Sequence, residues 1–454
     1  MFERDPSRNK LTAIVLALSG HYIGYYLPIF NSLAVPILEM YYGLSPEESL
    51  RVQGNLNFLY CLGGTIGVCL IGVAVNRFGR IQMTMALDIS TLIVGMLSTF
   101  NSLTILQIAR FLSGFITGMH NMISGLILVE LFPSELAGFG NLFICLVSGT
   151  FSFITFIQQS MFSYETLEKY WRLFLSWPLI IGVFRFLYLF LYLRIMTPKY
   201  ICLKYRDSPE LENFIKASYL NIYTEEGIDD KIKSTIEQFD ADSGKDEESI
   251  STLFSAKYIH QTWTCFLLKV WEQLTGISFL MFFSTHYFNK VSGNGKFVST
   301  VMGISNIAGS CVGMYIVNKF RRVPAMKFGV LMQGLSLLGI YLCALVKLNF
   351  LMPVLIVVYT VTYMAGLGGL NGLYITELLP AHGLGLSIGV GWFFYALVGK
   401  LSNFGVELMG ENNTMIMYAI SCLGLQWFIG RFCVERGEEK REEVLKPLVP
   451  IETV

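Results

Sequence analysis

One long polar segment, residues 199–258, interrupts a chain that otherwise consists mostly of apolar runs. Six apolar runs precede this segment and six follow it, and each approaches or exceeds the roughly 20 residues that a helix needs to cross a bilayer. The runs lie at residues 11–37, 54–75, 82–100, 104–128, 138–160, 173–195, 261–285, 297–317, 326–346, 350–377, 383–407 and 414–432. We therefore predict an all-α integral membrane protein whose twelve transmembrane helices form two six-helix halves.

The low charge content agrees with a membrane protein. Only 15% of the residues are charged, whereas about 25% are charged in a typical soluble domain. Lys and Arg in short loops mark the cytoplasmic side. They precede the first run, join the second run to the third and the eighth to the ninth, and follow the twelfth. Both termini are thus expected in the cytoplasm, with a first half at 1–198, a linker with short helices at 199–258, a second half at 259–433 and a tail at 434–454.

The two halves carry related loop sequences. NRFGR at 76–80 lies between the second and third runs, and NKFRR at 318–322 lies at the same place in the second half. ELFP at 130–133 follows the fourth run, and ELLP at 377–380 follows the tenth. Duplicated halves of this kind place a transported solute at the interface of the repeats, near mid-membrane. The repeat therefore favours a transporter over a receptor or a membrane enzyme.

These loops and several helix motifs resemble the sugar porters of the major facilitator superfamily, the family of the facilitative hexose transporters. GGTIG at 63–67, leading into NRFGR, resembles the family's second helix and its GxxxNRxGRR loop. ARF at 109–111 with Gly114 resembles the GRFxxG of the fourth helix, and EQLTGI at 272–277 is similar to the QQLSGIN of the seventh. TPKY at 197–200 stands where the family has PESPRF. The resemblance covers nearly the whole chain and implies transport by alternating access.

The resemblance implies a set of gating residues, which are Arg77, Arg80, Arg110, Glu130, Arg322 and Glu377. Arg and Glu at cytoplasmic helix ends can pair with each other and with helix termini. Such pairs would hold the cytoplasmic ends together while the outer side is open; alternatively, the arginines only orient the chain in the membrane. Some expected arginine partners are missing, because Ile81, Ala137 and Leu384 stand at those positions.

The resemblance also implies a substrate-binding set, which is Gln273, Asn306, Glu272, Ser278, Tyr363, Tyr395 and Cys145. A sugar offers hydroxyls and weakly apolar faces, so its site needs neutral amides and aromatic rings. Gln273 and Asn306 retain amides of the family's site, and the alternative for each is a hydrogen bond between helices. Cys145, Ser278 and Tyr395 stand where the family has amides. The family's acidic residue and Trp of the tenth helix are Met364 and Gly372 here.

Glu272 adds a charge in the middle of a predicted span. A charge at this depth is costly unless it faces water or a partner, so it is a candidate functional residue. The alternative is a pair with Lys269, one helical turn earlier. Arg185 and Lys400 are the other charges within spans that could partner it.

These features predict a hexose transporter that works by facilitated diffusion. Proton-coupled sugar porters carry an Asp in the first span, whereas this chain has no acidic residue between Lys10 and Glu39. A polyol or organic-anion carrier and a non-transporting nutrient sensor remain as alternatives. We expect a multi-pass protein of the plasma membrane whose partners are the lipid bilayer and a small solute. We expect no enzymatic activity, cofactor, metal or nucleic-acid partner. The C-terminal residues 451–454 also suggest a weak contact with a PDZ-type groove.

Overall fold

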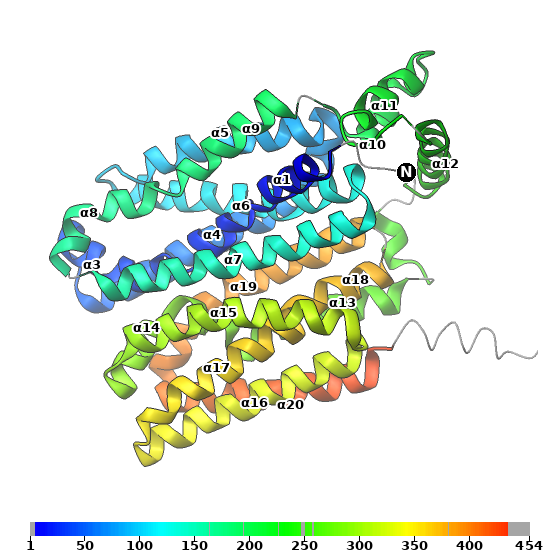
Figure 1. Cartoon of the computed structure of the whole chain (residues 1–454). Coiled ribbons are helices and arrows are strands. Elements are labelled where there is room, and N and C mark those ends of the chain that lie inside the picture. Colours follow the sequence, from blue (N-terminus) through cyan, green and yellow to red (C-terminus); the bar gives the residue numbers. More distant parts are fainter. Residues whose placement is uncertain are drawn as a thin grey trace, which may run out of the picture.

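The computed structural model describes residues 5–434 apart from 163, 194, 226, 247–249, 257 and 380, and it is built from helices packed side by side (Figure 1). The described residues form helices and loops and contain no strand. The predicted all-α membrane fold is therefore confirmed. The predicted tail, including its 451–454 motif, lies outside the described residues except for Val434.

The first predicted span is broken into three helices, α1 (Pro6–Ala17), α2 (Gly20–Tyr26) and α3 (Phe30–Tyr42). Pro28 lies in the second break, where its missing N–H interrupts the helical hydrogen bonds. The half continues with α4 (Pro46–Phe78), α5 (Arg80–Leu97), α6 (Leu103–Leu131), α7 (Ser134–Met161), α8 (Tyr164–Ser176) and α9 (Leu179–Tyr192). The helices α8 and α9 share the sixth span and are separated at Pro178.

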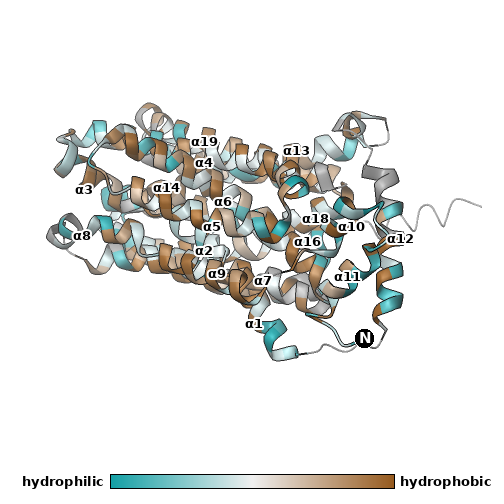
Figure 2. Ribbon diagram, turned by 90° about the horizontal axis from the view of Figure 1, so that it is seen from above, coloured by the Kyte–Doolittle hydropathy of each residue, from teal (hydrophilic) through white to brown (hydrophobic). Residues whose placement is uncertain are grey.

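The linker folds into α10 (Pro198–Tyr205), α11 (Leu211–Tyr219), α12 (Ile228–Asp246) and a short 3₁₀ turn, η1 (Ile250–Phe254). These helices carry more hydrophilic residues than the bundle (Figure 2). Asn9 Nδ2 donates to the carbonyl oxygen of Ile222 at 3.0 Å, and Ser218 Oγ donates to that of Met196 at 2.8 Å. The linker is thus bound to the first half. The longest of these helices, α12, continues to Asp246.

Two spans of the second half are interrupted by π-helical turns. The seventh span consists of α13 (Ile259–Glu272), the π-turn η2 (Gln273–Ile277) and α14 (Ser278–Ser292). The tenth span consists of the short turn η3 (Asn349–Leu351), α17 (Met352–Thr362), the π-turn η4 (Tyr363–Gly368) and α18 (Gly369–Leu378). The remaining spans are α15 (Gly295–Lys319), α16 (Arg322–Val346), α19 (Ala381–Met409) and α20 (Glu411–Phe432).

Every predicted span corresponds to a helix or a broken helix. In the part of the chain that the structure describes, 10 segments are long and apolar enough to cross a membrane. The two other predicted spans are the broken α1–α3 and α7, whose apolar part covers residues 143–158. The twelve-helix organisation therefore follows from the described helices.

Small residues allow close helix packing within the first half. A Cβ added at Gly114 of α6 would lie 1.7 Å from the carbonyl oxygen of Tyr60 in α4. Likewise, a Cβ at Gly63 of α4 would lie 2.0 Å from the carbonyl oxygen of Phe111. Such contacts are typical of membrane helices, whose association depends on close backbone approach. Between the halves, α4 packs on α19 and α7 packs on α15.

The two ends of the bundle differ. We call the end that carries α10–α12 the linker end and the other, with α3, α8 and α14, the far end (Figure 1). At the far end, Asn31 Nδ2 donates to the carbonyl oxygen of Met281 at 2.9 Å and to Ser284 Oγ at 2.8 Å. Gln53 Nε2 donates to the carbonyl oxygen of Phe282 at 3.0 Å. Buried amides of the first half therefore bind α14 of the second half.

Candidate solute-binding cavity

A cavity of about 390 Å³ lies between the two halves. The first half contributes Asn121, Ser148 and Ser152 to its polar lining. The second half contributes Lys269, Glu272, Gln273 and Asn306, together with the aromatic residues Tyr363, Trp392 and Tyr395. A volume of this size with a few convergent polar groups and aromatic walls is typical of a small-molecule site.

The breaks in the seventh and tenth spans determine how the second half lines this cavity. Gly276 in η2 has φ +91°, a left-handed conformation that other residues rarely adopt. A Cβ at Gly276 would also lie 2.9 Å from the ring of Tyr418, so the site requires glycine. Gln273 starts η2 and Tyr363 starts η4, and both residues line the cavity. Single π-turns within membrane helices are frequent at functional sites.

Glu272 accepts hydrogen bonds from three side chains. Lys269 Nζ lies 2.9 Å from its Oε2, so the pair that we named as the alternative for Glu272 is formed. The Tyr363 hydroxyl donates to Oε1 at 2.9 Å, and Asn371 Nδ2 donates to Oε2 at 2.6 Å. Glu272 is only 4% exposed. The carboxylate therefore connects the seventh span to the tenth at the wall of the cavity.

The amides Gln273 and Asn306 both line the cavity. Asn306 Nδ2 donates to Ser152 Oγ of the first half at 3.1 Å, while its Oδ1 has no protein partner. Gln273 Oε1 accepts a hydrogen bond from Ser278 at 3.4 Å. Asn306 therefore makes the interhelical bond that we named as its alternative and still has an acceptor to offer a solute.

Not every predicted substrate-binding residue lies on the cavity. Tyr363 and Tyr395 line it, and the Tyr395 hydroxyl is buried without a protein partner. Ser278 is fully buried behind Gln273, and Cys145 is exposed on α7 outside the lining. The cavity-lining residues of α7 are Ser148, Gly149 and Ser152, one to two turns further along the helix. Trp392 of α19 supplies an aromatic face that the sequence comparison did not assign.

Four of the predicted gating residues form two equivalent ion pairs at the linker end. Arg80 Nε lies 3.1 Å from Glu130 Oε2 in the first half, and Arg322 Nε lies 2.8 Å from Glu377 Oε1 in the second. The repeated sequence motifs thus form repeated contacts, each within one half. Arg77 is exposed beside this end, and its guanidinium lies over the ring of Phe78 at 5.5 Å.

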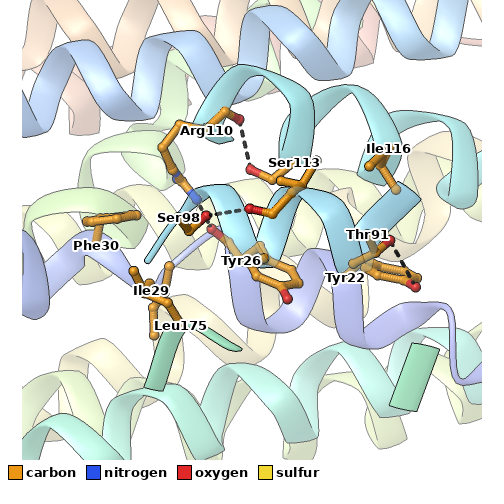
Figure 3. A pocket seen from close by; sticks show the side chains of 12 residues that line it. Tyr22, Tyr26, Ile29, Phe30, Thr91, Ser98, Arg110, Ser113, Ile116 and Leu175 are labelled. Atoms are coloured by element: carbon orange, nitrogen blue, oxygen red, sulfur yellow. Dashed lines mark hydrogen bonds between the residues drawn. The ribbon is translucent and has the colours of Figure 1, made fainter. Parts of the chain in front are cut away.

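Arg110 belongs to a different cluster, because α6 begins at the far end and Arg110 lies near its start. Its guanidinium donates to the carbonyl oxygen of Tyr26 at 2.7 Å (Figure 3). It also lies over the rings of Phe30 and Tyr60. It borders a small cavity of about 20 Å³, which also touches Tyr22 and Thr91. Arg110 is thus not part of the ion pairs at the linker end.

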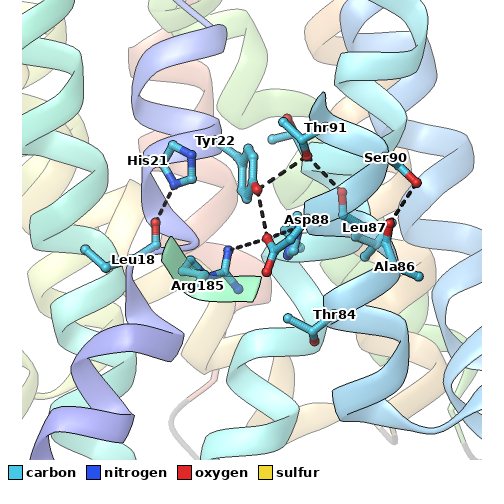
Figure 4. Close-up of polar contacts among 12 residues, drawn as sticks. Leu18, His21, Tyr22, Thr84, Ala86, Leu87, Asp88, Ser90, Thr91 and Arg185 are labelled. Atoms are coloured by element: carbon cyan, nitrogen blue, oxygen red, sulfur yellow. Dashed lines mark hydrogen bonds and ion pairs between the residues drawn. The ribbon is translucent and has the colours of Figure 1, made fainter. Parts of the chain in front are cut away.

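The first half contains a buried charged cluster that the sequence analysis did not predict. The Tyr22 hydroxyl donates to Asp88 Oδ1 at 2.8 Å (Figure 4). Arg185 Nη1 and His120 Nε2 each lie 3.3 Å from the same oxygen. The side chains of Asp88, His120 and Arg185 are completely buried. Arg185 therefore partners Asp88 and not Glu272, and Lys400 lies over the ring of Phe58 at 4.8 Å.

Duplicated helical halves around a polar cavity at their interface define a solute transporter of the major facilitator type. Comparison with known proteins gives the family. Residues 12–445 match the family model described as "Sugar (and other) transporter". The chain belongs to this sugar porter family of the major facilitator superfamily, whose members are transporters and not enzymes.

Known relatives extend over almost the whole chain. The arabinose-proton symporter of Bacillus subtilis (strain 168) is 23% identical over 96% of this chain and 94% of its own length. The plastidic glucose transporter 4 of Arabidopsis thaliana is 23% identical over 95% of this chain and 78% of its own. The facilitated trehalose transporter Tret1 of Bombyx mori is 20% identical over 96% of this chain and 85% of its own.

Solved structures share the fold. A partially occluded inward open form of the xylose transporter XylE from E. coli superposes with a TM-score of 0.77. The alignment covers 95% of this chain and 99% of that one at 15% identity. At this identity the likeness supports the fold and says nothing of the solute.

Proposed function

We propose that this protein carries a hexose, glucose- or fructose-like, by facilitated diffusion with alternating access. The observation that carries the proposal is the cavity between the halves, which presents the neutral amides Gln273 and Asn306 beside the aromatic faces of Trp392 and Tyr395. Amides both donate to and accept from sugar hydroxyls, and aromatic rings cover the apolar face of a sugar ring. The proposal includes the plasma membrane as location, with the linker end in the cytoplasm.

The contacts between halves support an inward-facing arrangement. Asn31 and Gln53 bind α14 at the far end, which the loop charges place outside the cell. The ion pairs Arg80–Glu130 and Arg322–Glu377 each remain within one half at the cytoplasmic end. Rocking of the halves about the central cavity would open the far end and close the linker end, as alternating access requires.

Facilitated diffusion is supported by the first span, which lacks an acidic residue between Lys10 and Glu39. The relatives include both a proton symporter and a facilitated trehalose transporter. The mode of transport of this chain is therefore part of the proposal.

One observation favours an organic anion as a second candidate solute. Lys269 lines the cavity, and the structure records one hydrogen bond of its ammonium group, to Glu272. An ammonium group has three donors, so Lys269 can also bind an acceptor on the solute. A carboxylate would be such an acceptor.

Uptake of labelled solutes into liposomes that contain the purified protein tests the proposal. We expect saturable hexose flux, and we expect Gln273→Leu to raise KM about tenfold because a hydrogen-bonding group is lost. Gln333→Leu is the matched control, since Gln333 is a buried amide outside the cavity lining. Flux of an organic anion or polyol without hexose flux would replace the hexose. Ligand binding without flux of any solute would indicate a sensor.

A further inference from the structure

The Glu272 carboxylate bridges the break in the tenth span. Its two neutral donors come from opposite sides of this break: Tyr363 is the first residue of η4, and Asn371 lies beyond η4 in α18. One carboxylate oxygen binds each of them, at 2.9 Å and 2.6 Å. Because the two oxygens have a fixed separation, a change in the bend that alters the distance between the two donors must distort at least one of these bonds.

Glu272 also lies directly before the break in its own span. It is the last residue of α13, and η2 begins at the next residue. Within this turn, Thr275 Oγ1 donates to the carbonyl oxygen of Glu272 at 2.7 Å. The position of the carboxylate is therefore linked to the geometry of η2 as well as to that of η4.

The surroundings strengthen these bonds. Glu272 is 4% exposed, Asn371 is fully buried and Tyr363 is 8% exposed. Hydrogen bonds to a charged acceptor are shorter and stronger than neutral ones, and a low-dielectric site increases their strength. Asn371 Oδ1 has no protein partner, so Glu272 provides the hydrogen bond that holds this side chain.

A solute can reach part of this arrangement. Lys269, Glu272 and Tyr363 line the cavity, whereas Asn371 is not among the lining residues. Hydroxyl groups of a bound solute are both donors and acceptors, so they can exchange with the hydrogen bonds of Lys269 and Tyr363. A bound solute can therefore change the hydrogen bonds of the Glu272 carboxylate, which contacts the breaks of both the seventh and the tenth span.

We propose that Glu272 is a positioning residue that clamps the bend of the tenth span to that of the seventh, and that a bound solute releases this clamp. The release by solute rests on the proposed function, but the clamp itself does not. Glu272 therefore acts on the conformational step that follows solute binding rather than on affinity.

The test uses the full-length protein in liposomes with a reporter thiol, Thr376→Cys, on the exposed linker-end part of α18. The exposed Cys69, Cys145 and Cys311 are replaced by Ser. Glu272→Gln and Asn371→Leu each weaken the clamp, and the second variant leaves the carboxylate paired with Lys269. Tyr359→Phe is the matched control, because it removes a hydrogen bond between the same two spans, from Tyr359 to the Thr275 carbonyl oxygen at 3.2 Å, without spanning η4.

Without solute, we expect the labelling rate of the reporter to change about threefold or more in both clamp variants and to stay within about 1.5-fold in Tyr359→Phe. With a transported hexose, we expect the labelling change seen in the parent to be lost in both clamp variants, together with most of the flux. The hexose Kd should stay within about threefold in Asn371→Leu, because Asn371 lies outside the cavity lining. Clamp variants that label like Tyr359→Phe, or a loss of flux in Asn371→Leu explained by a weaker Kd, would overturn the proposal. Absence of hexose flux in the parent would reject the hexose assignment. The labelling rates measured without solute would still show whether Glu272 clamps the two spans.

Discussion

Asp88 is a buried carboxylate in the membrane part of α5, and its neighbours offset the free-energy cost of burying its charge. Tyr22, His120 and Arg185 approach it from three other helices. An unpaired charge in this environment costs several kcal/mol, and such residues within spans pair with one another. The cluster therefore holds the helices α2, α5, α6 and α9 of the first half together.

Removal of the cation from this cluster should destabilise the protein strongly. Arg185→Met leaves the Asp88 carboxylate without its cation, and we expect a loss of about 3–5 kcal/mol. The double variant Asp88→Leu with Arg185→Met should lose less, because no unpaired charge remains. Thermal unfolding in detergent measures both. Equal midpoints for Arg185→Met and the unmodified protein would show that Asp88 does not depend on Arg185.

The sequence predicted contacts between neighbouring residues better than contacts between spans. The Lys269–Glu272 pair follows from helical spacing, and the structure contains it. The partner of Arg185 was not predictable in this way, since Asp88 lies on another span and no spacing rule connects the two. The same reason explains why Trp392 and Asn371 were not assigned to the site.

At the scale of helices, hydropathy predicted where the spans lie but not where they break. Hydropathy reports how long an apolar run is, and a π-turn does not change that length. The positions of η2 and η4 therefore cannot be recognised from hydropathy. Gly366 and Gly368 lie within η4 and Gly369 begins α18, and glycine tolerates the unusual backbone angles of a break. The division of the first span into α1, α2 and α3 was not predicted, although Pro28 marks one of its breaks.

The repeated ion pairs should influence which side of the transporter is open. Arg80→Ala and Arg322→Ala each remove an ion pair that is formed in this inward-facing arrangement, and we expect a shift away from the inward-facing state of about 1 kcal/mol. The effect should be larger at Arg80, whose side chain is 4% exposed compared with 28% for Arg322. Thiol labelling from each side of the membrane measures the shift. Unchanged labelling in both variants would mean that these arginines only orient the chain.

Because the linker packs on the bundle, we expect the thiol of Cys202 to be unreactive. Cys202 in α10 is buried, and burial raises the pKa of its thiol to about 11. Since the thiolate is the reactive form, only about one thiol in a thousand is ionised at pH 8. We expect maleimide to modify Cys202 at least about a hundredfold more slowly than Cys introduced at the exposed Ser234 in a Cys202→Ser protein. Equal rates, measured by mass spectrometry, would mean that the linker separates from the bundle.

For the whole molecule, transport should not depend on a proton gradient. The first span offers no acidic residue at mid-membrane, so solute should equilibrate across the membrane without accumulating. Liposomes with and without an imposed pH difference should reach the same internal hexose concentration. Accumulation driven by the gradient would contradict facilitated diffusion. Its loss in Asp88→Asn or in Glu272→Gln would then identify the coupling carboxylate.

The two ends of the molecule also differ in how their polar contacts respond to dissolved salt. The far end is joined by buried neutral amides, Asn31 and Gln53, which mobile ions do not screen. At the linker end, Arg322 and Glu377 are partly exposed, and salt weakens exposed charge pairs within a Debye length of about 8 Å at physiological ionic strength. The protein should therefore keep its outer closure in media of widely different salinity, whereas the ionic strength of the cytosol would set how readily its inner face rearranges.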